Sequence, residues 1–303
     1  MTDFSEWRTF DYQDAIVQLW VFKNSSTLAR FRAWHVRTDE EIENMFRGVL
    51  ESEVTRITES LPYTILSQNN DNSCLLHSLN ESEGLASLLV AVNAPETENT
   101  IAQLKQLQGA SGYLVKFQDG RRTVYAVKKT APTWKPKVRR RLMNTMFVNG
   151  ELSAVPSESF AFEAYFDFYC LNSTILVASR RAYESAVSDK TIYRRSFEDL
   201  MVDPGFAMVV SDTEPLRRFV GENTIHLKRM TAIKQKALFT RPGFTERVKI
   251  VSEARNWGIN FDSDGKIVIC EDTARVVIQV FLDHRLFSEV TETIYDVPDA
   301  EAI

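Results

Sequence analysis

Short β-type runs dominate the first part of the chain. Residues 15–23 and 28–36 are rich in β-branched and aromatic side chains, and a polar stretch at 24–27 separates them, which predicts an opening hairpin. Apolar residues then recur at helical spacing through 42–57, behind Asp39, which can cap a helix. We therefore expect a hairpin followed by an amphipathic helix whose outer face is acidic.

Two more hairpins are predicted around Asp-Gly pairs. Asp119-Gly120 separates β-type runs at 112–118 and 121–127, and the stretch 262–265 separates runs at 259–261 and 267–270. An Asp-Gly pair readily adopts the positive φ angles that a two-residue hairpin turn needs. The sequence therefore places tight turns at both positions.

Strict alternation is clearest at 160–170. Apolar residues occupy every even position there, while Glu163, Tyr165, Asp167 and Tyr169 occupy the odd positions, which predicts a strand with one buried and one solvated face. A second strand at 173–178 is expected to pair with it across a short turn. The pattern is then mainly helical to about residue 257, and a helix at 274–282 and a strand near 291–295 follow the last hairpin.

These elements predict an α+β protein in two parts. Residues 1–150 would form a β-rich amino-terminal unit with strand hairpins, and residues 151–303 a mixed sheet-and-helix carboxy-terminal unit. The chain of 303 residues is 44% hydrophobic and 25% charged, which is a globular composition and long enough for two structural units.

The sequence lacks the motifs of common catalytic and metal sites. Its eleven glycines form no phosphate-binding loop, and its four histidines are never paired at ligand spacing. Cys74 and His77 make at most half of a zinc site, and the stretch from Asp262 has Thr273 where a calcium loop needs a bidentate acid. We therefore predict no catalytic residue, metal ligand or cofactor.

The amino terminus has no secretory pattern, no apolar run reaches the length of a membrane span, and the three cysteines lie far apart. We therefore expect a cytoplasmic protein.

Positive charge is concentrated in one segment, although the formal net charge is −5. Between 121 and 141 there are nine basic residues and no acidic one, with an indole among them: Arg121, Arg122, Lys128, Lys129, Trp134, Lys135, Lys137, Arg139, Arg140 and Arg141. Such a pattern suits a loop that follows phosphates. It equally suits a solvated segment neutralised by the acidic helix at 39–59, and the sequence alone does not decide between these interpretations.

A second basic cluster is expected on a helix at 223–238. Steps of 100° place Lys228, Arg229 and Lys236 in one arc, opposite an apolar side. Many basic faces of this kind only keep a helix soluble.

A family resemblance appears from the Phe162–Tyr169 stretch onward. The runs Phe162-Glu-Ala-Tyr-Phe-Asp-Phe-Tyr169, Thr174-Ile-Leu-Val177, Arg181-Ala-Tyr-Glu184, Ile225 to Ile233 and Phe281 to Tyr295 occur in the order seen in KwaB-like proteins of the Kiwa anti-phage defence system. The chain resembles that family over about residues 105–297. The resemblance implies a DNA-binding effector that joins a KwaA-like membrane protein, forms a homodimer or higher homo-oligomer and restrains phage DNA. It implies no residue-by-residue match for Arg139, Arg140 and Arg141.

Together these observations predict a defence effector that binds DNA without sequence specificity. The basic residues of 121–141 would contact phosphates, Trp134 would stack on bases, and Lys228, Arg229 and Lys236 would extend the track. Two alternatives remain open. The basic segment could instead dock on acidic cytoplasmic loops of a membrane partner or on anionic lipid headgroups, which would hold the protein at the inner membrane. Scattered acids could also assemble a metal-dependent nuclease.

Overall fold

The chain forms two compact units in a computed structural model. The structure describes residues 5–25, 30–95, 99–101, 104–131, 137–138, 145–148, 151–154, 158–159, 162–187, 190–288, 291 and 293–297. Unit 1 comprises residues 1–63 and 67–188, and unit 2 comprises 64–66 and 189–303. The division expected near residue 150 was made on sequence pattern and stays a prediction.

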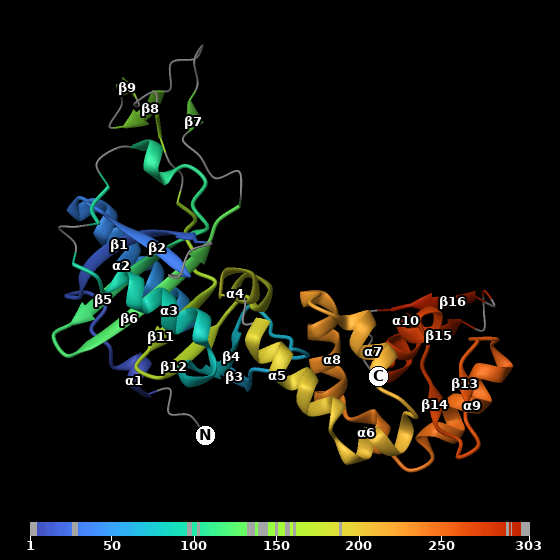
Figure 1. The fold of residues 1–303 in the computed structure, drawn as a ribbon. Coiled ribbons are helices and arrows are strands. Elements are labelled where there is room, and N and C mark those ends of the chain that lie inside the picture. The colour runs from blue at the N-terminus through green and yellow to red at the C-terminus, as the bar shows by residue number, and fades with distance from the viewer. Residues whose placement is uncertain are drawn as a thin grey trace. The chain divides into compact units, whose positions relative to one another are not determined.

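An eight-stranded sheet forms the centre of unit 1 (Figure 1). Its strand order is β2-β1-β5-β6-β11-β12-β4-β3, and every neighbouring pair is antiparallel except β3 and β4, which are parallel. The strands are β1 (Ile16–Asn24), β2 (Phe31–Val36), β3 (Glu59–Pro62), β4 (Ser73–Ser78), β5 (Gly112–Asp119), β6 (Arg122–Lys129), β11 (Phe168–Leu171) and β12 (Thr174–Val177). The β1–β2 hairpin confirms the one predicted at 15–36, and the β5–β6 hairpin confirms the one predicted at 112–127.

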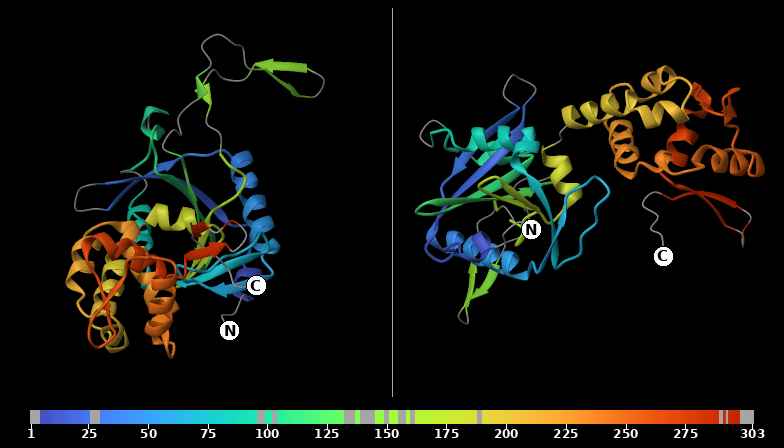
Figure 2. Two further views of the ribbon diagram at one scale, coloured as in Figure 1. Left: turned by 90° about the vertical axis from the view of Figure 1, so that its right-hand side faces the viewer. Right: turned by 90° about the horizontal axis from the view of Figure 1, so that it is seen from below.

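Helices cover both faces of this sheet, as the right-hand view of Figure 2 shows. Helix α2 (Glu40–Arg56) buries Phe46, Leu50 and Val54 against one face, together with the short α1 (Ser5–Arg8) region. Helices α3 (Glu83–Val92) and α4 (Arg180–Val187) pack on the opposite face. Because strand side chains alternate between faces, neighbouring residues of one strand belong to different cores.

Local signals in the sequence explain where these helices begin. Asp39 precedes α2, and its side chain accepts a hydrogen bond from the backbone N–H of Ile42 at 2.9 Å, as an N-cap should. Helix α3 crosses α4 closely at Gly84, where an added Cβ would lie 1.9 Å from the carbonyl oxygen of Val187. Only a glycine permits this approach of the two backbones.

Unit 2 is mainly helical. Its helices are α5 (Lys190–Met201), α6 (Pro204–Val209), α7 (Glu214–Val220), α8 (Thr224–Lys236), α9 (Phe244–Ala254) and α10 (Glu271–Phe281), and its hairpins pair β13 (Asn260–Phe261) with β14 (Ile267–Val268) and β15 (Arg285–Ser288) with β16 (Thr293–Asp296). Leu200, Leu227, Met230 and Val277 are at most 1% exposed in its core. The β13–β14 pair confirms the hairpin predicted around 262–265.

The predicted fold class is confirmed, because helices and a large mixed sheet together make an α+β protein. One strand differs from its prediction. Of the alternating stretch, residues 162–170 are described, and among these the strand begins only at Phe168. Asp167 and Tyr169, expected to face solvent, are 3% and 0% exposed. Helices on both faces of the sheet and the Asp167 ion pair described below explain this burial. Among the described residues, no helix is both long and apolar enough to cross a membrane.

Candidate nucleic-acid interface

The basic segment belongs to a long excursion between two adjacent strands of the sheet. Strand β6 ends at Lys129 and β11 begins at Phe168, yet Val127 and Phe168 are paired residues of one antiparallel ladder. Inside the excursion, β7 (Lys137–Val138) pairs with β10 (Glu158–Ser159), and β8 (Thr145–Val148) pairs with β9 (Glu151–Ala154). The chain therefore leaves the sheet and returns to it as paired antiparallel strands.

A buried ion pair joins the two points where this excursion leaves and rejoins the sheet. The Lys128 Nζ lies 3.1 Å from Asp167 Oδ1 and 2.7 Å from Glu163 Oε2, and it lies 3.7 Å from the centre of the Tyr165 ring. Lys128 and Asp167 are 5% and 3% exposed. The second oxygen of Asp167 accepts the backbone N–H of Lys129 at 2.7 Å. Asp167, the residue before β11, is therefore bonded to the last two residues of β6, Lys128 and Lys129.

Burial and the neighbouring charges shift the pKa values of the residues in this cluster. Burial alone would lower the pKa of Lys128, but its hydrogen bonds to Glu163, Tyr165 and Asp167 outweigh burial and raise that pKa. The Lys128 ammonium lowers the pKa of Glu163, while burial raises the pKa of Asp167. The ammonium of Lys128 is thus engaged on three sides by this chain's own groups.

Lys129 has different surroundings. Its Nζ donates to the carbonyl oxygens of Ser111 at 3.0 Å and Thr130 at 3.2 Å, and burial lowers its pKa. Its ammonium is therefore bound by neutral acceptors, and no carboxylate of the described residues forms an ion pair with it.

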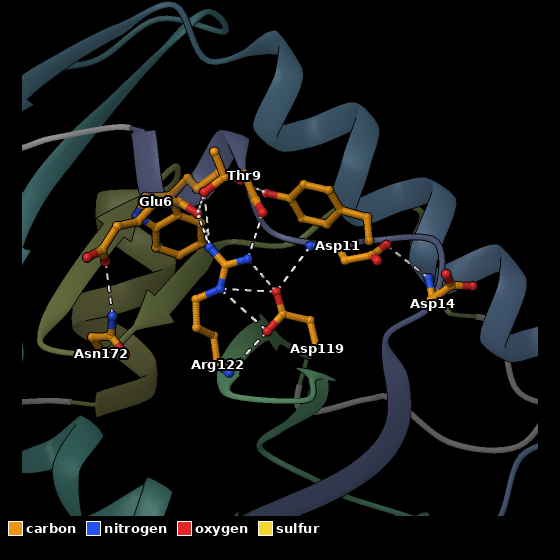
Figure 3. A network of polar contacts seen from close by, with 9 residues as sticks. Glu6, Thr9, Asp11, Asp14, Asp119, Arg122 and Asn172 are labelled. Atoms are coloured by element: carbon orange, nitrogen blue, oxygen red, sulfur yellow. Dashed lines mark hydrogen bonds and ion pairs between the residues drawn. The ribbon is translucent and has the colours of Figure 1, made fainter.

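Arg122 connects the β5–β6 turn to the amino-terminal segment (Figure 3). Its guanidinium pairs with Asp119 and donates to the carbonyl oxygens of Thr9 at 2.6 Å and Glu6 at 3.2 Å. It also lies 5.4 Å from the centre of the Phe10 ring. Arg121, one residue earlier in the turn, is exposed, so adjacent arginines have different surroundings.

The remaining members of the first cluster fall largely beyond the described residues. Lys137 is described through its backbone, as the first residue of β7 opposite Ser159. The other members, Trp134, Lys135, Arg139, Arg140 and Arg141, lie outside the part of the chain that the structure describes.

The second cluster lies on α8 in unit 2. Lys236 donates to the carbonyl oxygen of Leu282 at 2.6 Å, and the Lys228 Nζ lies 5.4 Å from the centre of the Tyr193 ring. Arg229 is partly exposed. The two clusters belong to different units, and their union in one continuous track stays a prediction.

Sequence reasoning missed the acidic partners of two predicted site residues. Asp119 lies three positions before Arg122, across a predicted turn, so a local pairing could have been anticipated. Asp167 is 39 positions from Lys128, and no local pattern joins them. Among the described residues, no group of three or more His, Cys, Asp or Glu side chains could hold a metal ion.

Taken together, the fold and charges define a two-unit α+β protein whose sheet carries a cation-rich excursion between neighbouring strands. A family model described as Kiwa protein KwaB-like matches residues 107–291, which is more than half of the chain and includes both basic clusters. The chain belongs to this family and thereby to the Kiwa anti-phage defence system. Neither a curated protein nor a solved structure matches the chain.

Proposed function

We propose that this protein binds DNA without sequence specificity, as an effector of Kiwa defence that acts with a KwaA-like membrane protein. The observation that carries the proposal is the distribution of acidic partners around the basic segment. Asp119 is paired with Arg122, and Glu163 and Asp167 are paired with Lys128. The five basic residues from 135 to 141 follow with no acidic residue between 130 and 150.

This arrangement separates two roles within the cluster. In the proposal, Arg122 and Lys128 fix the two ends of β6, and the excess charge beyond them meets phosphates. The phosphate contacts are then Arg121, Lys129, Lys135, Lys137, Arg139, Arg140 and Arg141, with Trp134 stacking on bases, and Lys228, Arg229 and Lys236 contribute from unit 2. Contacts to phosphates alone carry no sequence information, so binding is expected to be non-specific.

The salt dependence of binding tests the electrostatic origin. If about five phosphates are neutralised, a slope near −0.9 per contact lowers the affinity roughly five-hundredfold between 50 and 200 mM salt. The assay is retardation of two unrelated duplexes of equal length, with the full chain and magnesium present or chelated. A flat salt response would contradict the proposal, and magnesium-dependent shortening of the DNA would instead indicate a nuclease.

Charge reversal tests the location. Arg139→Glu, Arg140→Glu and Arg141→Glu together should abolish retardation while the melting temperature stays unchanged. The matched control reverses three exposed arginines elsewhere in unit 1, Arg8, Arg32 and Arg37, and changes the net charge equally. Equal loss in both variants would mean that only total charge matters. Full binding by the first variant would place the site elsewhere.

The membrane partner requires its own measurement. Co-purification of the protein with a KwaA-like protein from nuclease-treated membranes is expected. Co-purification without any DNA retardation would show that the basic segment serves the partner and would refute the DNA-binding proposal.

A further inference from the structure

Unit 2 contains a pocket that the proposed DNA binding does not use. It lies among α9, the end of α10 and the start of β15, with a volume of about 730 Å³, within the range of small-molecule sites. The side chains of Phe244, Val251 and Val280 form an apolar part of its wall. The pocket is formed by residues 238–285 of one unit, so its shape does not depend on the other.

Two pocket residues have buried donor nitrogens for which the described part of the chain offers no acceptor. Among the described residues, the indole N–H of Trp257 and the Nε–H of Arg285 have no hydrogen-bond partner, although both nitrogens are buried. The two side chains adjoin, with the guanidinium 5.5 Å from the centre of the Trp257 ring. A buried donor left unsatisfied costs about 1–3 kcal/mol, and an acceptor atom in the pocket would remove that cost once the Trp257 or Arg285 side chain turns its buried nitrogen toward it.

The charge of the pocket is strongly positive. Among the described residues, Arg241, Arg247 and Arg285 line it together with one carboxylate, that of Asp283. Within the described part of the chain, none of the three guanidinium groups forms an ion pair with this carboxylate. Arg247 donates one N–H to the carbonyl oxygen of Pro242 at 2.7 Å, and Arg241 is exposed. Two guanidinium groups at the rim thus retain donors in the fork geometry that suits phosphate.

We propose that this pocket binds a nucleotide-like anion, in which a planar ring with acceptor atoms is joined to a phosphate. The apolar wall and the Trp257 indole suit the ring, and Arg241 and Arg247 suit the phosphate. A purely apolar ligand would leave the guanidinium groups unused, and inorganic phosphate would leave the apolar wall unused.

Titration calorimetry of the full chain tests both halves of this ligand. The probes are AMP, adenosine and ribose 5-phosphate. AMP is expected to bind with a dissociation constant below about 1 mM, and each half at least tenfold more weakly. Absence of AMP binding at millimolar concentration, or equal binding of AMP and ribose 5-phosphate, would overturn the proposal.

Variants localise the binding. Arg241→Ala and Arg247→Ala should each weaken AMP about tenfold, whereas Lys249→Ala, exposed on α9 outside the pocket, should not. Both side chains are exposed, but Arg247 also bonds the Pro242 carbonyl oxygen, so Arg241→Ala suffices if the Arg247 variant folds poorly. Unchanged AMP binding by Arg241→Ala would refute the assignment.

The proposal does not depend on DNA binding. The triple reversal at 139–141 should keep its AMP affinity, and Arg241→Ala should keep DNA retardation. Loss of AMP binding in the triple variant would show that the nucleotide occupies the DNA site, and it would overturn the assignment of AMP to the pocket.

Discussion

Removing the charge of Asp167 tests whether the ion pair under the basic segment is structural. Asp167→Asn preserves the shape of the side chain but leaves the Lys128 ammonium, 5% exposed, without its buried anion. Breaking a buried pair by removing one partner costs about 3–5 kcal/mol. Glu163 still contacts the ammonium, but its side chain is 57% exposed, and an exposed pair contributes at most about 1 kcal/mol. We expect a net loss of about 3 kcal/mol in the stability of unit 1.

A double-mutant cycle measures this coupling directly. Lys128→Met removes the cation while keeping an unbranched apolar chain. Lys128→Met with Asp167→Asn leaves no buried charge in the site, because the remaining carboxylate, that of Glu163, is 57% exposed to water. The double variant should therefore be more stable than the sum of the single changes predicts, by at least about 1.5 kcal/mol. Urea unfolding gives the free energies, and hydrogen exchange of the β6 and β11 amides assigns the loss to unit 1. A loss below about 1 kcal/mol for Asp167→Asn, with additive single variants, would refute the reasoning.

Two further predictions concern unit 1. Gly84→Ala should destabilise it by more than about 2 kcal/mol in urea unfolding, because the new Cβ would meet the Val187 carbonyl. The control Gly48→Ala, within α2 and with no atom within 4 Å, should stabilise it by about 0.5–1 kcal/mol; equal effects would contradict this. Burial alone would raise the pKa of Asp119, but hydrogen bonds from Arg122 and from the backbone N–H of Asp11 outweigh burial and lower that pKa. The resulting stability is present above the ordinary aspartate range and is lost as pH falls through the folded-state pKa, so the melting-temperature advantage over Asp119→Asn should shrink between pH 6 and pH 3. An advantage that is constant across this range would show that the charge is not its source.

Local patterns predicted most elements of the sheet correctly. The Asp119-Gly120 turn and the cap at Asp39 depend on a few neighbouring residues, and both appear where the sequence indicates. The strand at 168–171 was predicted too long, because alternation at 160–167 was taken as one solvated and one buried face. Asp167 is buried through a long-range partner, Lys128, and long-range partners leave no periodic signal.

The same distinction applies to the basic cluster. Charge density alone did not separate Arg121, which is exposed, from Arg122, whose guanidinium is bound by Asp119 and the Thr9 carbonyl. It also did not separate Lys128 from Lys129. Such differences arise from chain segments that meet only on folding, so counts of basic residues identify a segment and not its contacts. That these cations contact DNA stays a prediction.

The sheet order has a consequence for synthesis on the ribosome. Strand β4 is completed at Ser78, but its neighbour in the sheet, β12, ends at Val177. At about 5–20 residues per second, translation needs roughly 5–20 s to make the intervening chain. During that interval the inner edge of β4 lacks its partner strand, and the nascent protein would depend on chaperones to keep this edge from pairing with other chains.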